Sequence, residues 1–182
     1  MEKTKVGDWI ELEYDAFADG KLFDSTDSNK IKNAKPIKIK IGQAMVVKGL
    51  DAALTNKEIN KLYQVTLKPT EAFGNRRTEL IKTFPLARFK EQGLNPKPGM
   101  FLNFDGIIAK VLSIDSGRVK VDFNHPLAGK VLEYKFKIKR KIDKLDEQVQ
   151  ALLELFNLKA KVKVEEKQVK IYLEKPLDEK FK

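Results

Sequence analysis

The chain has 182 residues, 42% of them hydrophobic, and a net charge of +10, so it can bury one ordinary core or two small ones. It contains no cysteine and one histidine, which excludes disulfides, thiol chemistry and cysteine-based zinc sites and leaves few ligands for other metals. Neither a membrane-length apolar run nor a signal-peptide pattern is present, and we therefore expect a cytoplasmic protein without a membrane span.

The excess of 36 Lys and Arg over 26 Asp and Glu has two interpretations. It could indicate an anionic partner such as nucleic acid or the ribosome surface. Much of the lysine, however, alternates with apolar residues, as in residues 37–41 and 134–140, and this is typical of the solvent face of strands. We favour the second interpretation. High Lys and Glu content without Cys also hints at a thermophilic source.

The N-terminal third of the chain predicts three strands. Residues 9–14 alternate cleanly, which places Ile10, Leu12 and Tyr14 on one face. After a turn at residues 18–20, residues 21–26 continue extended and lead into a polar loop that ends at Pro36. Residues 37–41 alternate again.

The next segment, residues 41–54, predicts the floor of an apolar pocket. Gly42 allows a sharp turn after the strand, and Gly49 allows a short helix at residues 50–54 to approach the backbone closely. Val46 and Val47 would present branched side chains at the N-terminus of that helix. A strand at residues 61–68 and a break at residues 69–74 follow, where Phe73 is either a core residue or a pocket wall.

From residue 76 the sequence predicts a small inserted domain. It contains a strand at residues 80–84, a helix at residues 85–92, and strands at residues 100–104, 107–114 and 118–123 separated by turn signals.

The last third predicts a loop at residues 124–129, a long strand at residues 130–142, an amphipathic helix at residues 143–158 and a hairpin of residues 161–164 and 169–173. One helix and one hairpin give a thin core, so we expect this extension to pack on a partner or a second copy. The charged residues 178–182 are typical of a chain that has been cut short.

The chemistry of the residues alone excludes common catalytic classes. The sequence has no Gly-rich phosphate loop and no nucleophile elbow, and His125 has no serine nucleophile in a recognisable setting. Asp24 and Asp27 could bind a cation, but two loop carboxylates are usually just solvated. What remains is a group of apolar and aromatic residues at strand ends and loops, which form either ordinary core or a pocket: Tyr14, Phe23, Val46, Val47, Leu50, Phe73 and Tyr134.

Several motifs in one order resemble the FKBP-type peptidyl-prolyl isomerases, and more closely the SlyD type and its archaeal relatives. They are Tyr14 and the segments 20–26, 41–50, 72–74, 124–129 and 132–134. The resemblance implies an α+β fold in which an FKBP-like antiparallel sheet wraps on a short helix. It implies an isomerase domain of residues 1–75 and 124–142, an insert-in-flap chaperone domain of residues 76–123, and a C-terminal extension of residues 143–182 with a helix plus a hairpin.

The resemblance also implies a proline pocket without cofactor or metal. Its catalytic residues would be Tyr14, Phe23, Asp24, Phe73 and Tyr134, and its further substrate-binding residues would be Ile37, Val46, Val47, Leu50, Leu127 and His125. Three positions depart from the best-known single-domain members: Leu50 stands for the floor tryptophan, Ile37 for an aromatic wall and Phe73 for a hydrogen-bonding tyrosine. The pocket should therefore be wider and less polar, and macrolide inhibitor binding is in question.

The implied function is isomerisation of X-Pro bonds in unfolded or nascent polypeptides. The insert would hold these chains by edge pairing through Met100, Phe101, Leu102 and Phe104, unless those residues fill its own core. The alternative is a catalytically weak holdase or ribosome-associated adaptor bound through the basic surface. A pure dimerisation module through the C-terminal extension ranks last, because it leaves the ordered motifs unexplained.

Overall fold

The computed structural model describes residues 2–156, 158–165 and 168–173, so the charged end at residues 178–182 lies outside the described part of the chain. The chain forms two compact units. The first unit runs to Ala72 and resumes at Val131, and the second unit comprises Phe73–Lys130. Across the described residues, no helix has the length and apolar character needed to cross a membrane.

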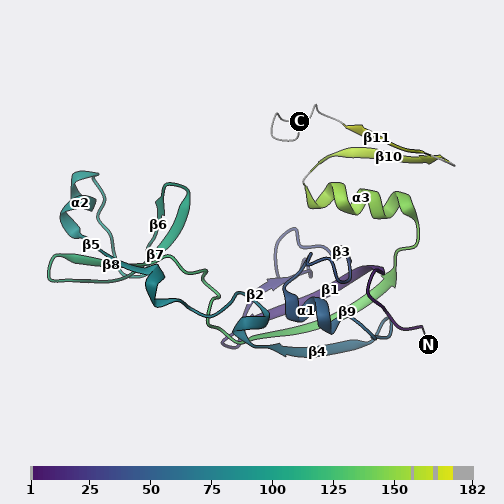
Figure 1. The fold of residues 1–182 in the computed structure, drawn as a ribbon, viewed down its shortest axis with the longest axis horizontal. Helices are drawn as coiled ribbons and strands as arrows, with labels where there is room; N and C mark the ends of the chain where they lie inside the picture. Colours follow the sequence, from purple (N-terminus) through teal and green to yellow (C-terminus); the bar gives the residue numbers. More distant parts are fainter. Residues whose placement is uncertain (1, 157, 166–167, 174–182) are drawn as a thin grey trace. The chain divides into compact units, whose positions relative to one another are not determined.

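The first unit is built on a five-stranded antiparallel sheet (Figure 1). Its strands are β1 (Trp9–Ala18), β2 (Lys21–Ser25), β3 (Ile37–Lys40), β4 (Leu62–Leu67) and β9 (Leu132–Lys141). They pair in the order β2-β1-β9-β4, and β3 also pairs with β1. Alternation buries one face, as with Ile10 and Leu12 on β1 and Phe136 and Ile138 on β9. The α+β fold with a short helix on an antiparallel sheet is thus confirmed.

The short helix α1 (Lys48–Ala53) lies over β4 and the 3-10 turn η1 (Pro69–Glu71), as Figure 1 shows. Gly49 makes this approach possible, since a Cβ there would lie 2.6 Å from the Leu67 side chain. The carboxylate of Asp51 accepts hydrogen bonds from the backbone N–H groups of Gly42 and Ala44, at 2.8 and 3.1 Å. The turn that follows β3 is therefore tied to the helix, and the predicted roles of both glycines are confirmed.

The other face of the sheet carries cross-strand ion pairs. Acidic residues of β1 lie beside basic residues of β9, so Glu13 pairs with Lys137 and Lys139, each at 3.1 Å, and Glu11 pairs with Arg140 at 2.8 Å. The alternating lysines Lys137 and Lys139 are thus strand residues on a solvent face, as the sequence pattern indicates, and both pair with an acid of the neighbouring strand.

The second unit is a four-stranded antiparallel sheet with one short helix. Its elements are η2 (Thr78–Leu80), β5 (Ile81–Pro85), α2 (Leu86–Glu91), β6 (Phe101–Phe104), β7 (Ile107–Asp115) and β8 (Arg118–Asp122), paired in the order β5-β8-β7-β6. Its core combines residues of all four strands with Phe89 of α2.

Two residues expected on the chaperone surface lie in that core instead. Leu102 is 8% exposed, and Phe104 packs on Phe84 and Phe89 at ring-centroid distances of 5.7 and 6.2 Å. Because side chains of a strand alternate between its faces, Leu102 and Phe104 point inward while Phe101, which is 52% exposed, points outward. The expectation for Leu102 and Phe104 is corrected accordingly.

The C-terminal extension consists of α3 (Leu145–Leu155) and a hairpin of β10 (Ala160–Glu165) and β11 (Gln168–Leu173). Ala151 of α3 packs with Trp9, Ile142 and Met45 of the first unit. Only part of the predicted apolar stripe is buried, and the remaining apolar residues of the helix and its end are exposed: Leu145, Leu152, Leu155 and Phe156.

Candidate functional site

Three aromatic side chains meet on the first unit where β1, β2 and β9 lie side by side. The register of β1 and β9 places Tyr14 opposite Phe136 and Ala16 opposite Tyr134, so the small Ala16 leaves room for the two tyrosine rings to approach. The Tyr14 and Tyr134 ring centroids are 5.8 Å apart. Phe23 meets Tyr134 edge-on at 6.3 Å, a favourable aromatic geometry.

A β-bulge in β2 explains how Phe23 and Asp24 both reach this site. Asp24 lies opposite Ala16 and Leu22 lies opposite Phe17, so Phe23 is the extra residue of the pair. A bulge breaks the alternation of side chains and re-aims them, which allows two consecutive residues to serve the same site. The only sign of this bulge in the sequence is the irregular apolar pattern after the Asp19-Gly20 turn.

Asp24 is held by two hydrogen bonds. The hydroxyl of Tyr14 donates to its Oδ2 at 2.6 Å, and the backbone N–H of Ser25 donates to its Oδ1 at 2.9 Å. Burial, and then the carboxylate of Asp24, raise the pKa of Tyr14 far above its usual value, and burial raises the pKa of Tyr134 to about 12. Both tyrosines are therefore neutral at physiological pH, and Tyr14 is a fixed donor to Asp24.

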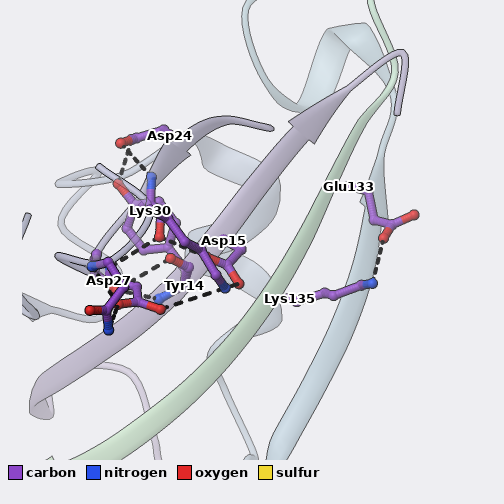
Figure 2. Close-up of polar contacts among 10 residues, drawn as sticks. Tyr14, Asp15, Asp24, Asp27, Lys30, Glu133 and Lys135 are labelled. Carbon is purple, nitrogen blue, oxygen red and sulfur yellow. Dashed lines mark hydrogen bonds and ion pairs between the residues drawn. The ribbon is translucent and has the colours of Figure 1, made fainter. Parts of the chain in front are cut away.

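A second polar network, not predicted from the sequence, anchors the loop after β2 to β1. Figure 2 shows Lys30 reaching Asp15 and Asp27, with N–O distances of 2.5 and 3.8 Å. The buried Ser25 donates its hydroxyl hydrogen to Asp15 at 2.6 Å. Asp27 also accepts hydrogen bonds from the backbone and side chain of Asn29, at 2.9 and 3.0 Å. Asp24 and Asp27 are thus satisfied by separate protein donors rather than arranged around a common cation.

The remaining predicted pocket residues of the first unit lie on β3 and around the start of α1. Ile37, the first residue of β3, pairs with Leu12 and is half-buried. Val46 and Val47, which precede α1, are half-buried, while Leu50 is 1% exposed and part of the core. Half-buried branched side chains are suited to an apolar wall, and a fully buried leucine is suited to a floor.

Phe73, His125 and Leu127 belong to the second unit, where they lie near its chain ends. The rings of Phe73 and His125 stack in parallel, 4.2 Å between centroids and 3° between planes. His125 Nδ1 accepts a hydrogen bond from the backbone N–H of Leu127 at 3.2 Å, and Gly129 N–H donates to the carbonyl of Gly74 at 2.8 Å. Through these contacts, the segments at the two chain ends of the second unit lie side by side. A contribution of Phe73, His125 and Leu127 to a proline pocket stays a prediction.

The second unit also has an exposed apolar surface. Met100 and Phe101 are 42% and 52% exposed, and two neighbours that the sequence interpretation did not select, Ile107 and Ile108, are 58% and 59% exposed. A cleft of about 500 Å³ is lined by Phe101, Ile108 and Leu112 together with residues of the 124–130 loop. The position of Phe101 and Ile108 on one solvent face of β6 and β7 follows from strand register, which a single sequence does not fix.

Comparison with known proteins identifies two families. A model described as "FKBP-type peptidyl-prolyl cis-trans isomerase" matches residues 1–98, which is more than half of the chain, and one described as "FKBP26, IF domain" matches residues 82–127. The short-type peptidyl-prolyl cis-trans isomerase of Methanocaldococcus jannaschii is 31% identical over 144 residues, which cover 74% of this chain and 92% of that protein.

Two bacterial proteins are similar at nearly the same level. The FKBP-type peptidyl-prolyl cis-trans isomerase SlyD of Helicobacter pylori is 30% identical over 132 residues, covering 70% of this chain and 69% of its own length. The FKBP-type 16 kDa peptidyl-prolyl cis-trans isomerase of Escherichia coli is 30% identical over 124 residues, covering 65% and 83%.

Proposed function

The chain belongs to the FKBP-type peptidyl-prolyl cis-trans isomerase family, and on this premise we propose that it isomerises X-Pro bonds of unfolded or partly folded polypeptides at the site around Tyr14, Phe23 and Tyr134. The observation that carries this assignment is a cluster of three aromatic rings beside the carboxylate of Asp24. This carboxylate already accepts a hydrogen bond from Tyr14. Such a site offers an apolar surface for the proline ring and no nucleophile.

The reaction suits this geometry because it makes and breaks no covalent bond. Twisting a prolyl amide costs about 18–20 kcal/mol, since it breaks amide resonance. The twisted amide has a less charged carbonyl than the planar one, so a dry aromatic cleft that excludes water favours it over the ground state. Phe23 and Tyr134 would hold the proline ring. Asp24, which already accepts from Tyr14 and Ser25, would orient the pocket rather than transfer a proton.

The second unit would hold the unfolded chain near the isomerase site. Phe101 and Ile108 expose apolar surface on neighbouring strands, and β6 lies at the edge of its sheet. An edge strand can pair with an extended segment largely independently of its sequence. Holding a client in this way would raise the local concentration of its prolines around the isomerase unit.

A catalytically weak holdase or ribosome-associated adaptor is the competing function, favoured by the basic character of the second unit. NMR exchange spectroscopy on a short apolar-X-Pro peptide separates the two. Faster cis/trans exchange with catalytic amounts of protein, lost in Phe23→Ala, is expected for an isomerase. Unchanged exchange with a folded protein would refute the isomerase proposal, and steeply salt-dependent ribosome binding would then support the adaptor.

The exposed apolar residues of α3 suggest that the C-terminal extension is covered by a second copy of the chain. Sedimentation equilibrium of the full chain and of Leu155→Lys tests this: a dimer that the variant abolishes is expected, and a monomeric full chain would refute it.

A further inference from the structure

Basic residues outnumber acidic residues two to one in the second unit. Between Phe73 and Lys130, where every residue is described, there are ten Lys and Arg residues but five Asp and Glu residues, so this unit holds five of the ten net positive charges of the chain. Two of its arginines form ion pairs, Arg76 with Asp122 and Arg77 with Glu79. Seven other basic residues have no ion pair within the described part of the chain: Lys82, Arg88, Lys90, Lys97, Lys110, Arg118 and Lys120.

Three of these seven share the sheet face opposite the core, which we call the open face. Val119 and Val121 of β8 are buried, so Arg118 and Lys120, which alternate with them, point to the open face. Lys110 of β7 lies between Phe101 of β6 and Asp122 of β8 in the strand register, and its Nζ is 5.9 Å from the Phe101 ring centroid.

The acidic side chains of this face, Asp115 and Asp122, accept hydrogen bonds from neighbouring residues. Both oxygens of Asp122 accept hydrogen bonds, Oδ2 from the Arg76 guanidinium at 2.6 and 2.9 Å and Oδ1 from Asn124 at 2.7 and 2.9 Å. Asp115 accepts from the Ser116 hydroxyl at 3.2 Å. Among the described residues Asp115 has no ion pair, so three cations without an ion pair, Lys110, Arg118 and Lys120, outnumber one such carboxylate on the open face.

Two adjoining clefts combine these charges with apolar surface. The cleft of about 500 Å³ combines Phe101, Ile108 and Leu112 with Lys110 and the paired Arg76 and Asp122. A more polar cleft of about 460 Å³ is lined by Arg118 and Lys120 together with Thr83, Ser113, Ser116 and the single carboxylate of Asp115. The row Lys110–Asp122–Ile81 and the row Ser113–Lys120–Thr83 are neighbouring rows on the open face, separated by one row that contains the inward-facing Val111 and Val121. An extended chain can therefore place an apolar side chain and an acidic side chain on the two clefts together.

We propose that the open face selects extended polypeptide segments in which aromatic or aliphatic residues are flanked by Asp or Glu. This selectivity rests on the proposed chain-holding role of the second unit and adds the chemistry of the client to it. Apolar burial against Phe101 and Ile108 supplies affinity, while Lys110, Arg118 and Lys120 supply the preference between clients of similar hydrophobicity.

Two fluorescein-labelled peptides test the selectivity by fluorescence anisotropy on the full chain. They share one apolar core and lack proline, so that the isomerase site does not contribute, and they are flanked either by Glu or by Lys. The Glu-flanked peptide is expected to bind about tenfold more tightly at low salt, and the gap should close at high salt. Lys110→Gln should reduce the gap about threefold, whereas Lys90→Gln, a change of equal charge on α2, should leave it unchanged.

The outcomes distinguish the chain-holding role of the second unit from its preference for acidic segments. If neither peptide binds, the chain-holding role itself fails and the selectivity with it. If both peptides bind with equal affinity, the chain-holding role is supported and the proposed preference for acidic segments is wrong. An RNA oligonucleotide of random sequence can be compared with an unlabelled copy of the Glu-flanked peptide as a competitor. If the RNA displaces the labelled peptide more effectively, the open face binds any negatively charged polymer, and the preference for a polypeptide is overturned.

Discussion

The Tyr14 hydroxyl lies 2.6 Å from Oδ2 of Asp24 and donates its hydrogen to it. This contact joins β1 to the bulged end of β2 and fixes both an aromatic wall and the carboxylate of the proposed site (Figure 2). Since burial and the Asp24 charge hold the pKa of Tyr14 far above 10, the donor persists across the physiological pH range.

Removing this donor should lower isomerase activity without unfolding the protein. Tyr14→Phe leaves the Asp24 carboxylate with one donor, a loss of about 1–3 kcal/mol for a partly buried charged acceptor, and kcat/KM should fall by about five- to a hundredfold. Asp24→Asn should produce a similar loss, and the double variant should lose little more, because both changes break one interaction. Tyr172→Phe on the exposed hairpin is the matched control. Strictly additive losses would show that the two side chains act separately.

Truncation of Phe23 tests whether the bulge presents a substrate-binding surface. Phe23→Ala removes the ring that meets Tyr134 edge-on, and peptide turnover should fall at least about tenfold through loss of apolar contact with the proline. Tyr134→Ala should do the same, with circular dichroism used to confirm folding because Tyr134 is buried. Leu62→Ala, at a position 70% exposed on β4, should retain full activity. Undiminished exchange in both aromatic variants would place the proline elsewhere.

The strands of the two sheets show how much of the fold could be predicted from the sequence. Alternation located β1, β3, β4 and β9, because a half-buried strand repeats every two residues, and turn signals separated the strands of the second unit. It could not reveal the bulge at Phe23, which depends on the pairing of β1 with β2, nor the Lys30 contact with Asp15, which depends on how the loop after β2 folds back. The assignment of Leu102 and Phe104 to a surface failed for a related reason: hydrophobicity marks a strand, but the inward face is set by its partners.

Gly49 is a packing position, so even alanine should destabilise the first unit. The added Cβ would lie 2.6 Å from Leu67 Cδ2, 3.0 Å from Glu71 Cβ and 3.1 Å from the Glu71 carbonyl oxygen. The backbone oxygen cannot move as a side chain can, and we expect Gly49→Ala to reduce the free energy of unfolding by about 1–3 kcal/mol in urea denaturation. Ala52→Ser on the exposed side of α1 controls for helix propensity. Unchanged or increased stability would mean that α1 shifts freely away from β4.

The Asp122 carboxylate should make the stability of the second unit depend on acidic pH. Burial alone would raise the pKa of Asp122, but hydrogen bonds from Asn124 and Arg76 and the charge of Arg76 outweigh burial and hold the pKa below its usual value. A depressed pKa means that the contribution is complete above the unfolded-state value of about 3.9 and is lost as pH falls through the lower folded-state value.

Asp122→Asn should therefore lower the midpoint of urea unfolding at neutral pH and flatten its decline below about pH 4. Because the change weakens the pairing with Arg76, the expected loss at neutral pH is about 1–3 kcal/mol. Asp105→Asn, in the exposed turn between β6 and β7, should change neither quantity. An unaltered acid limb in Asp122→Asn would assign the acid sensitivity to other carboxylates.

Replacing the second unit with a short loop should separate catalysis from client holding. The Gly129 N–H donates to the Gly74 carbonyl at 2.8 Å, so the two chain ends of the second unit are adjacent. A few glycine and serine residues can therefore join Gly74 to Gly129 in place of residues 75–128. The shortened chain keeps Tyr14, Phe23, Asp24 and Tyr134, and its turnover of a short X-Pro peptide should stay within about threefold of the full chain. Its catalysis of a proline-limited protein refolding reaction should fall by at least about tenfold, because the client is no longer held at high effective concentration. An equal fall in both assays, from a variant with native circular dichroism, would mean that the second unit contributes to the proline pocket itself, through residues such as His125 and Leu127.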